Sequence, residues 1–539
     1  MNPLFFKKNW MISGIFLCGM FTVAEVPPIF SLLDGVQAQE TDIFQHPHVE
    51  QAGIRKSLAD QIGTGRGDIH TPGSSLYIIG RDPFRSIRRG RNLFQRKFTL
   101  SQGMGPRNGD GFGDISADAS LGAGLADSCA ACHGRPRGSA GFGGDVFTRP
   151  DSRDAPHLFG LGIIEMLADE ITHNLRETRN QAIIRAQTTQ SMVEVGLQSK
   201  GISYGRIRVN PDGAVDPSQL EGVDEDLRVR PFFHHGGTIS IREFVVGAFN
   251  GEMGLEVFDP DLAKASAGER IVTPAGMVLD GALDAIETPP AASESDDPDL
   301  DGLANEIPVS LVDHLEFYLL NYFKPGIGRQ THDTEKGEQI FQDSHCTTCH
   351  IQNLVIEKDR RVADVETTYN PQRGIFNELF AVATPQFQEI PESGSPPLKA
   401  PNRQRFVVKN IYADFKRHDL GPNFWERNFH GTLTKQFMTE PLWGVGSSSP
   451  YGHDGRSIDL RSVIMRHGGE AQAARDRFVR LPDVKQRQLI DFLQSLILFP
   501  PDDTASNLNP GDPQAPNFPQ YGHGNIALPV LFNDPTDPE

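Results

Sequence analysis

Two short cysteine motifs constrain this chain more than any other feature of its sequence. Residues 129–133 read CAACH, residues 346–350 read CTTCH, and the one remaining cysteine is Cys18. Both motifs follow the pattern C-x-x-C-H, in which two thiols add to two vinyl groups of a haem and the adjacent histidine binds the iron. The sequence therefore predicts two haem c groups, attached at Cys129, Cys132 and His133 and at Cys346, Cys349 and His350.

Cysteine pairs of this spacing have two other interpretations. A zinc site joins two C-x-x-C pairs, but such pairs normally lie close together, whereas most of a domain separates these two. A thioredoxin-like motif requires a βαβ context and no histidine after each pair. Two complete motifs, with no spare cysteine in the body of the chain, favour haem attachment.

The N-terminal segment has the pattern of a secretory signal peptide. Lys7 and Lys8 precede an apolar run over residues 10–23, and residues 36–38 (VQA) form a small-residue cleavage site. An uncleaved membrane anchor is the alternative, but a Glu-Val-Pro-Pro interruption disfavours a continuous span. We expect residues 1–38 to be removed and the protein to be periplasmic or otherwise exported, the compartment in which bacteria attach haem c.

Composition and charge narrow the possible partners. The 539-residue chain is 38% hydrophobic and carries a formal charge of -19, which describes a soluble globular body with an acidic surface. Such a surface disfavours nucleic acid and anionic membranes as partners. It would suit a small basic electron-donor protein, although a solvated acidic surface without any partner is equally common.

A repeated glycine–phenylalanine spacing precedes each cysteine motif. Gly90 and Phe94 lie ahead of the first motif, and Gly337 and Phe341 lie ahead of the second. Residues four apart share one face of a helix. Each glycine could therefore permit a close helix crossing while the phenylalanine packs inward.

Two further amphipathic segments are expected to close the two halves. Residues 309–322 and 484–498 have apolar side chains at helical spacing, and residues 239–250 form another helix candidate. The order of helix, cysteine motif, loops and closing helix thus occurs twice, which chance similarity between amphipathic helices explains less well than an internal duplication. We expect a mainly α fold with two cytochrome c-like haem domains, long loops and a large insertion in the first domain.

These features define an expected domain organisation. The boundaries follow the composition changes and the ends of the two closing helices. The expected parts are a signal peptide at 1–38, an extended N-terminal arm at 39–84, the first haem domain with its insertion at 85–325, the second haem domain at 326–499, and a Pro-rich acidic tail at 500–539.

Several longer segments resemble a known family. They are residues 128–135 (SCAACHGR), 153–163 (RDAPHLFGLGI), 297–307 (DPDLDGLANEI), 441–458 (PLWGVGSSSPYGHDGRSI) and 465–471 (MRHGGEA). Over these segments the chain resembles the di-haem oxidoreductase family, relatives of bacterial di-haem cytochrome c peroxidase. The same scaffold is similar to the enzyme that matures methylamine dehydrogenase and to the bacterial rubber oxygenases. The resemblance therefore supports a fold and a redox role more firmly than a substrate.

The resemblance implies two unequal haems, one that can open a coordination site and one that is six-coordinate. In di-haem peroxidases an H-D-G motif is followed fourteen residues later by the distal ligand, and here the corresponding position is His467. A histidine that caps its helix before two glycines is the alternative interpretation. Met438 is a weaker candidate for the same role, and Met465 points in another direction on the helix.

The residues of the H-D-G-R motif have two interpretations of equal weight. His453, Asp454 and Arg456 could bind a haem propionate or hold the distal loop, or they could form a charged turn at the start of a helix. Trp443 could lie near a haem edge or pack in the core. In the peroxidases a bridging tryptophan lies in the first half, and this chain departs from that pattern.

The first haem has no obvious distal ligand, which favours an open and reactive iron. His157 could reach the iron or line the pocket, whereas Met166, Met192 and Met253 are possible ligands that belong more often to a core. Cleavage of a peroxide also requires a nearby acid or base. Glu252 is the candidate for that catalytic role beside His133, with a solvent-exposed glutamate as the alternative.

An acidic segment could bind calcium. Asp297, Asp299 and Asp301 place carboxylates at alternating positions before Gly302, as in the first half of a calcium loop. Close carboxylates repel one another unless a cation lies between them. The alternative is an acidic surface loop without an ion.

The leading functional hypothesis is a peroxidase-type enzyme. Electrons from a small donor protein would enter at the haem of His467, and hydrogen peroxide or another small oxidant would be reduced at the haem of His133. Two other functions remain open, namely an electron-transfer cytochrome with both irons saturated and a di-haem oxidase or oxygenase that acts on an organic substrate. No nucleic-acid partner and no stable membrane span are expected.

Overall fold

The computed structural model describes residues 58–105, 126–133, 154–498 and 526–527, apart from 299, 323, 373–377 and 428–431. All of these residues belong to one unit, Gln39–Glu539, and Met1–Ala38 forms another. The predicted signal peptide, the arm before residue 58 and most of the tail lie outside the described residues and stay predictions. Among the described helices, none combines the length and the apolar composition that a bilayer crossing requires.

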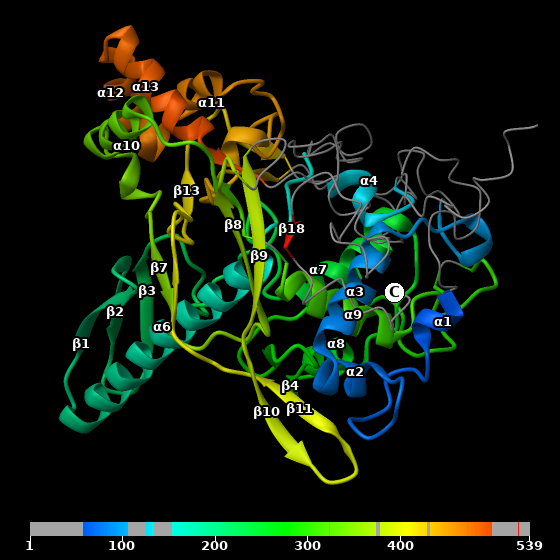
Figure 1. Ribbon diagram of the computed structural model, residues 1–539. Coiled ribbons are helices and arrows are strands. Elements are labelled where there is room, and N and C mark those ends of the chain that lie inside the picture. The colour runs from blue at the N-terminus through cyan, green and yellow to red at the C-terminus, as the bar shows by residue number, and fades with distance from the viewer. Residues whose placement is uncertain are drawn as a thin grey trace, which may run out of the picture. The chain divides into compact units, whose positions relative to one another are not determined.

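The fold is mixed rather than mainly α. Of the described residues, 37% are helical and 20% are in strands, which form several small sheets, so the mainly α expectation is wrong. Most of the described strands lie in the long connections between each cysteine motif and its closing helix (Figure 1). Their signal was visible as alternation of apolar and polar residues, for example over 193–199 and 202–209. The repeated helices do not predict the secondary structure of these connections.

The largest sheet of the first half is an antiparallel meander. Its strands β1 (Val193–Ser199), β2 (Ile202–Val209) and β3 (Val215–Leu220) pair in sequence order. Lys200 and Gly201 both have positive φ, which a two-residue hairpin turn requires. The long helix α6 (Leu161–Thr189) packs along β1 and β2 and covers this sheet (Figure 1).

The first half is organised around a close helix pair. Helix α3 (Pro83–Gln95) crosses α9 (Val309–Leu320), and a Cβ on Gly90 would overlap the backbone oxygen of His314. The ring of Phe94 lies 6.0 Å from that of Tyr318 on the partner helix. The predicted helices and the predicted role of Gly90 in a close crossing are confirmed.

The second half repeats this construction. Helix α10 (His332–Asp343) crosses α13 (Asp483–Gln494), and a Cβ on Gly337 would overlap the backbone oxygen of Gln488. The ring of Phe341 lies 5.5 Å from that of Phe492. The same glycine–phenylalanine device thus joins an opening helix to a closing helix in both halves, in agreement with the internal duplication expected from the sequence.

Side-chain caps set the start of many of these helices. Ser74 caps α2, Thr331 caps α10 and Asp459 caps α11, each through a hydrogen bond to a backbone N–H of the first turn. The short helices α1 and α2 lie within 58–84, so the expectation of an extended arm is wrong for that part. The remaining helical elements are α1 (Leu58–Ile62), α2 (Ser75–Arg81), η1 (Leu100–Gln102), α4 (Cys129–His133), α7 (Ile241–Ala248), the π-helix η2 (Phe249–Met253), α8 (Pro260–Ser266), η3 (Cys346–Thr348), η4 (Val445–Ser447), α11 (Leu460–Arg466), η5 (Gly469–Ala471) and α12 (Gln472–Arg480).

The remaining strands are short and pair mostly as isolated ribbons. The described parallel pair joins β18 to β9, and the other described strand pairs are antiparallel. These strands are β4 (Arg270–Val272), β5 (Val278–Asp280), β6 (Gly326–Ile327), β7 (Leu354–Ile356), β8 (Ala363–Tyr369), β9 (Leu379–Pro385), β10 (Phe387–Glu392), β11 (Ser395–Pro401), β12 (Phe406–Val408), β13 (Arg417–Asp419), β14 (Glu426–Arg427), β15 (Leu433–Thr434), β16 (Gln436–Met438), β17 (Leu496–Ile497) and β18 (Ile526–Ala527).

Two hydrophobic clusters form the core. The larger one spans the first half, its insertion and the strands β7 and β8. The smaller one surrounds the second cysteine motif and draws its side chains from α10, α11, α12 and α13, which group together in Figure 1. Its members are Ile340, Phe341, Tyr412, Leu460, Phe478, Leu489, Phe492, Leu493 and Leu496.

The close crossing of α10 and α13 predicts that Gly337→Ala destabilises the protein. The new methyl group would overlap the backbone of Gln488, and forcing the helices apart should cost about 1–3 kcal/mol in the free energy of unfolding. Gly247→Ala is the matched control, because that helical glycine has no atom within 4 Å of the added Cβ. The control should be neutral or stabilising by up to about 1 kcal/mol. Equal denaturant midpoints for both variants would contradict the close packing.

Candidate functional site

The first cysteine motif forms the short helix α4. Ser128 precedes it, and its hydroxyl accepts the backbone N–H of Ala131 at 3.2 Å. At the end of the helix, Nδ1 of His133 lies 2.7 Å from the carbonyl oxygen of Pro156. Because a carbonyl only accepts, Nδ1 carries the proton and Nε2 keeps its lone pair for a ligand. Burial raises the pKa of Cys129 to about 12, so the free thiol is neutral.

The second cysteine motif repeats this arrangement on the 3-10 turn η3. Nδ1 of His350 donates to the carbonyl oxygen of Tyr412 at 3.0 Å, which again leaves Nε2 with a lone pair. Burial lowers the pKa of His350 to about 4, so the ring is neutral at physiological pH. A neutral imidazole with one nitrogen fixed in this way is the form that binds a metal.

His467 is a third histidine of the same kind. It follows the last residue of α11, and its Nδ1 donates to the carbonyl oxygen of Val463 at 2.8 Å. Burial lowers its pKa below the ordinary value. The ring therefore also presents a free Nε2. His467 does occupy the helix-capping position of the alternative interpretation, but the hydrogen bond that holds it there is compatible with ligation.

His350 and His467 face one shared cavity of about 380 Å³. The two rings are close enough for a charge on one to disfavour a charge on the other. The sulfur-bearing residues Cys346 and Cys349 line the same cavity. Two thiols, two neutral imidazoles and an apolar wall are a donor set that fits a flat, largely apolar haem. The apolar wall is built by Phe341, Leu420, Phe424, Leu442, Leu460, Val463, Ile464, Phe478, Leu489 and Leu493.

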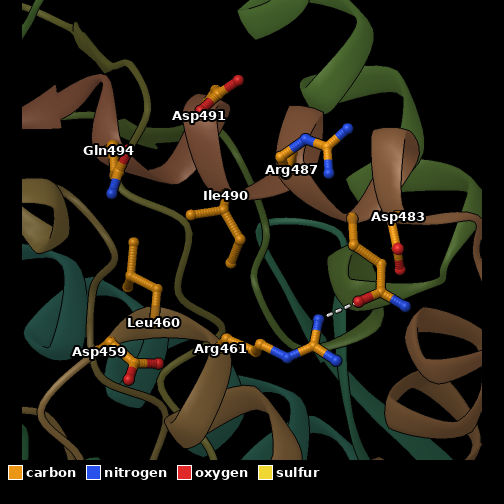
Figure 2. A pocket seen from close by; sticks show the side chains of 9 residues that line it. Asp459, Leu460, Arg461, Asp483, Arg487, Ile490, Asp491 and Gln494 are labelled. Carbon is orange, nitrogen blue, oxygen red and sulfur yellow. Dashed lines mark hydrogen bonds between the residues drawn. The ribbon is translucent and has the colours of Figure 1, made fainter.

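A second hollow of about 490 Å³ lies between α11 and α13 (Figure 2). It is lined by charged and amide side chains, among them Asp459, Arg461 and Asp483, and Arg461 donates a hydrogen bond to Gln486 across it. It contains no cysteine or histidine. Of these two hollows, only the cavity of His350 and His467 has the residues that could hold a haem.

The H-D-G-R motif stabilises the loop around this cavity. His453 lines the cavity, stacks on the ring of Phe437 at 4.2 Å and places Nε2 3.0 Å from a carboxylate oxygen of Glu426. Asp454 binds Arg466 through two contacts, of 3.0 and 2.7 Å. Arg466 directly precedes His467, so this ion pair holds the end of the helix that presents the third histidine.

Several acidic and basic groups line the end of the cavity that the first half contributes. His234 donates from Nδ1 to Glu440 at 2.7 Å, and burial raises the pKa of Asp154 to about 7. His157 also lines the cavity, but Nε2 lies 3.3 Å from the carbonyl oxygen of Trp443 and Nδ1 accepts the backbone N–H of Phe159. Because both ring nitrogens of His157 are engaged, the structure supports its pocket-lining role over an iron-ligand role.

Trp443 is a core residue between segments of the two halves. It is 4% exposed, and a Cβ on Gly160 would lie 2.6 Å from its ring. Gly160 has a φ of +75° and begins α6. The close contact explains why only glycine fits at this position. Of the two roles considered for Trp443, the structure shows core packing.

The other candidate residues are not brought to this cavity, with one exception. Met438 lines it. Met166 and Met253 are buried in the core, where the sulfur of Met166 accepts a backbone N–H, and Met192 is 61% exposed. Glu252 lies half-exposed on the π-helix η2 and is not among the residues that line the cavity. Its catalytic role stays a prediction.

The acidic loop has contacts that satisfy its carboxylates without an ion. Asp297 accepts the backbone N–H groups of Asp301 at 3.2 Å and Gly302 at 3.0 Å. Asp301 in turn accepts that of Leu303 at 2.6 Å. Asp299 lies outside the described residues. Turns of this type are common in loops that hold no ion, and calcium binding stays a prediction.

Sequence reasoning missed several residues of the site. These are the carbonyl acceptors of Pro156 and Tyr412 and the polar side chains Asp154, His234, Asp414, His418, Glu440 and Glu470. A backbone carbonyl has no sequence signal, because every residue has one. Asp154 and Glu470 lie in two of the segments that carry the family resemblance, but nothing in those segments indicates their partners. The side chains meet only after the two halves and their loops have packed together.

The buried pair of Asp454 and Arg466 predicts that Asp454→Asn destabilises the protein by roughly 1.5–3 kcal/mol in the free energy of unfolding. Burial alone would raise the pKa of Asp454, but the hydrogen bond from Arg466 outweighs burial and lowers it. The unfolded state therefore binds the proton more readily, and the contribution of Asp454 should be lost below the ordinary carboxyl pKa of about 4.

Urea unfolding of both proteins between pH 3 and pH 8 checks this prediction. Asp476→Asn is the matched control, because its partner Arg475 is partly exposed, and it should cost less than about 1 kcal/mol. A difference between wild type and Asp454→Asn that persists unchanged at pH 3 would show that the ionised carboxylate is not responsible.

Comparison with known proteins agrees with the cofactor chemistry of these residues. Residues 352–496 match the family described as "Di-haem oxidoreductase, putative peroxidase". The match begins two residues after His350 and includes the H-D-G-R motif and His467. Curated proteins gave no significant match. Haem is the cofactor that the family description implies for this segment.

Two solved structures show weak likeness. Hydrazine synthase of Kuenenia stuttgartiensis is 15% identical with a TM-score of 0.19, over 36% of this chain and 57% of that one. This chain thus spans little more than half the length of that protein. A MauG-like protein associated with microbial copper homeostasis is 12% identical with a TM-score of 0.25, over 63% of this chain and 89% of that one. At these scores neither likeness establishes a shared fold. The family match therefore covers residues 352–496 of this chain, in agreement with the resemblance that its sequence motifs indicated.

Proposed function

We propose that the protein is an exported c-type di-haem oxidoreductase of the peroxidase type. One observation carries the proposal: three half-buried histidines each fix Nδ1 on a backbone carbonyl, and two of them, His350 and His467, face one cavity together with Cys346 and Cys349. Each motif would attach one haem through its two cysteines, with His133 and His350 as the iron ligands on the motif side. Bound haem supplies one-electron redox chemistry and, where one face of its iron is open, the reduction of peroxide.

The two sites would have unequal ligands. At the second site His467 offers a second imidazole in the same cavity as His350, and a haem held by both histidines would suit electron relay. In the described part of the chain no equivalent histidine serves the first site, since His157 has both ring nitrogens engaged. The ring of Phe244 lies 6.2 Å from that of His133 and contributes an apolar wall there. The asymmetry supports an open, reactive first site and a saturated second site.

Side chains near the cavity can supply protons. Reduction of hydrogen peroxide to water consumes protons as well as electrons. Asp154 has a pKa of about 7 because burial disfavours its charge, so its carboxyl is partly protonated at neutral pH. Glu440, whose side chain is 55% exposed, accepts a hydrogen bond from His234 and offers a polar route from solvent to the same cavity. These groups line the cavity of the second site, and Asp154 lies two residues before Pro156, whose carbonyl oxygen binds His133, so its carboxyl would hold a proton on the side of the cavity that leads to the first site.

The proposal includes a compartment and an electron source. The predicted signal peptide at 1–38 and the two attachment motifs support a location outside the cytoplasm, where free thiols are normally oxidised. A small electron-donor protein would reduce the second site. Hydrogen peroxide or another small oxidant would be consumed at the first site. We expect no nucleic-acid partner, since the net charge is -19.

Haem content and spin state provide the direct test of this proposal. Mature protein expressed in a host that attaches haem c should carry two haems by mass spectrometry, and the double variant Cys346→Ser/Cys349→Ser should carry one. The ferric wild type should show one low-spin and one high-spin signal by EPR, and it should consume peroxide with an artificial donor. Two low-spin haems in every redox state would instead identify an electron-transfer cytochrome.

The role of His467 predicts a defined spectroscopic change. His467→Ala removes the second imidazole, so the low-spin EPR signal of the second haem should convert to high spin. His453→Gln is the matched control, because His453 lines the same cavity but pairs with Glu426. The control should keep the low-spin signal. Loss of the low-spin signal in His453→Gln and its retention in His467→Ala would show that His453, and not His467, supplies the second imidazole.

A further inference from the structure

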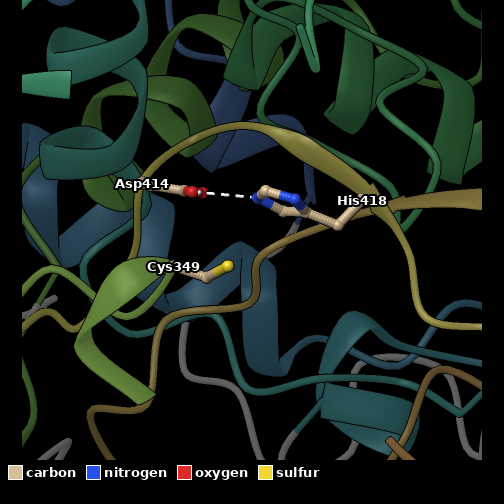
Figure 3. A group of neighbouring side chains, drawn as sticks. All are labelled: Cys349, Asp414 and His418. Carbon is tan, nitrogen blue, oxygen red and sulfur yellow. Dashed lines mark hydrogen bonds and ion pairs between the residues drawn. The ribbon is translucent and has the colours of Figure 1, made fainter. Parts of the chain in front are cut away.

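A buried charged group lies against the second cysteine motif. Ligand atoms of Cys349, Asp414 and His418 lie within 4.8 Å of one another (Figure 3). Such a group could suggest a separate metal site. However, Nε2 of His418 lies 2.9 Å from Asp414 and Nδ1 lies 2.7 Å from Glu470, so neither ring nitrogen has a lone pair to offer. The geometry therefore describes an ion-pair network rather than a metal site.

The ring of His418 bridges two carboxylates in this network. Each of its nitrogens faces a carboxylate oxygen, and a carboxylate can only accept, so both nitrogens carry a proton. Burial alone would lower the pKa of His418, but the hydrogen bond to Asp414 opposes burial and raises it. The imidazolium thus binds the two carboxylates at the same time.

One arm of the network reaches the loop that orients His350. Asp414 lies two residues after Tyr412, whose carbonyl oxygen accepts the Nδ1 proton of His350. Ala413 in the same loop donates its backbone N–H to Ile351 at 3.1 Å. Asp414 is 2% exposed, so this arm is well buried. His418 therefore holds the segment that fixes the proximal imidazole.

The other arm reaches the turn that comes after His467. Glu470 accepts from His418 and also accepts the backbone N–H of Asp419 at 2.9 Å. Gly468 donates to the carbonyl oxygen of Leu420 at 2.9 Å. Gly469 has a φ of +49°, and a Cβ there would overlap the backbone oxygen of Asp419. The turn after His467 is thus docked on β13, the strand that carries His418.

We propose that His418 is a positioning residue that joins the proximal loop to the distal turn and so keeps His467 opposite His350. The inference rests on the proposed haem at this site and adds to it the residue that controls its second ligand. The distal arm is the weaker one, because the Glu470 side chain is 51% exposed whereas that of Asp414 is 3% exposed. Loss of the Glu470 contact should free the distal turn and let His467 leave the metal.

Substitution of Glu470 tests this role with little risk of unfolding, because its side chain is half-exposed. In the full di-haem protein, Glu470→Ala should reduce the low-spin EPR signal of the second haem by roughly twofold or more, as a shift between two ligation states requires. Added imidazole should restore the low-spin signal by replacing His467. Glu470→Gln keeps an acceptor for His418 and should recover most of the wild-type signal.

A second variant and a matched control complete the test. His418→Gln removes the cation and should give the same high-spin increase, together with a lower reduction potential, since a positive charge near a haem favours its reduced form. Glu221→Ala is the control, because Glu221 pairs with Lys416 beside β13 at 3.1 Å but does not contact the distal turn. The control should leave the spectrum unchanged.

The possible outcomes separate this inference from the proposed function. Unchanged low-spin signals in both Glu470→Ala and His418→Gln would overturn the positioning role alone. High-spin signals that imidazole fails to restore would indicate general disruption of the pocket and would also overturn it. A wild-type protein without two attached haems would overturn the proposed function, and with it this inference.

Discussion

A hydrogen bond from a histidine Nδ1 to a backbone carbonyl is the interaction on which the whole site depends. It occurs at His133, His350 and His467, and each time it fixes the tautomer and aims Nε2 away from the main chain. At His133 and His350 the carbonyl belongs to a loop well after the motif, at Pro156 and Tyr412. The direction in which each Nε2 points therefore depends on how these loops pack.

That packing is organised by two equivalent helix pairs. Gly90 lets α3 approach α9, and Gly337 lets α10 approach α13, because a side chain at either position would meet backbone atoms of the partner helix. Helix α10 ends just before the second cysteine motif, whereas a longer segment that includes η1 separates α3 from the first motif. Beyond the motifs the two halves differ, since the first carries α6 and the sheet of β1–β3, whereas the second carries the helices that bring His467 to its cavity. The same frame thus supports two different environments.

At the second site, charged contacts hold the chain on both sides of His467. Asp454 forms an ion pair with Arg466, the residue before His467. Glu470, which lies three residues after His467, accepts a hydrogen bond from His418. The third histidine is therefore held from both sides by charged contacts, of which one is buried and the other half-exposed. Buried ion pairs contribute little net stability compared with apolar packing, but they specify one arrangement of the groups they join. Here the arrangement specified is that of the distal turn relative to the proximal loop.

The amino-acid sequence by itself determined the two C-x-x-C-H motifs, the helices that frame them, the glycines at their crossings and the candidate His467. These features are local, because the spacing of a few neighbouring residues is enough to indicate a helix face or a C-x-x-C-H motif. The mainly α expectation failed because the helical pattern around each motif gives no information about the connections, in which strand pairs such as the hairpin over 193–209 form. Only the tertiary structure decided which carbonyls orient the histidines and which carboxylates surround His418. The carbonyl that orients His350 lies 62 residues away, and a backbone oxygen or a single aspartate has no pattern that a sequence could display before the chain has folded.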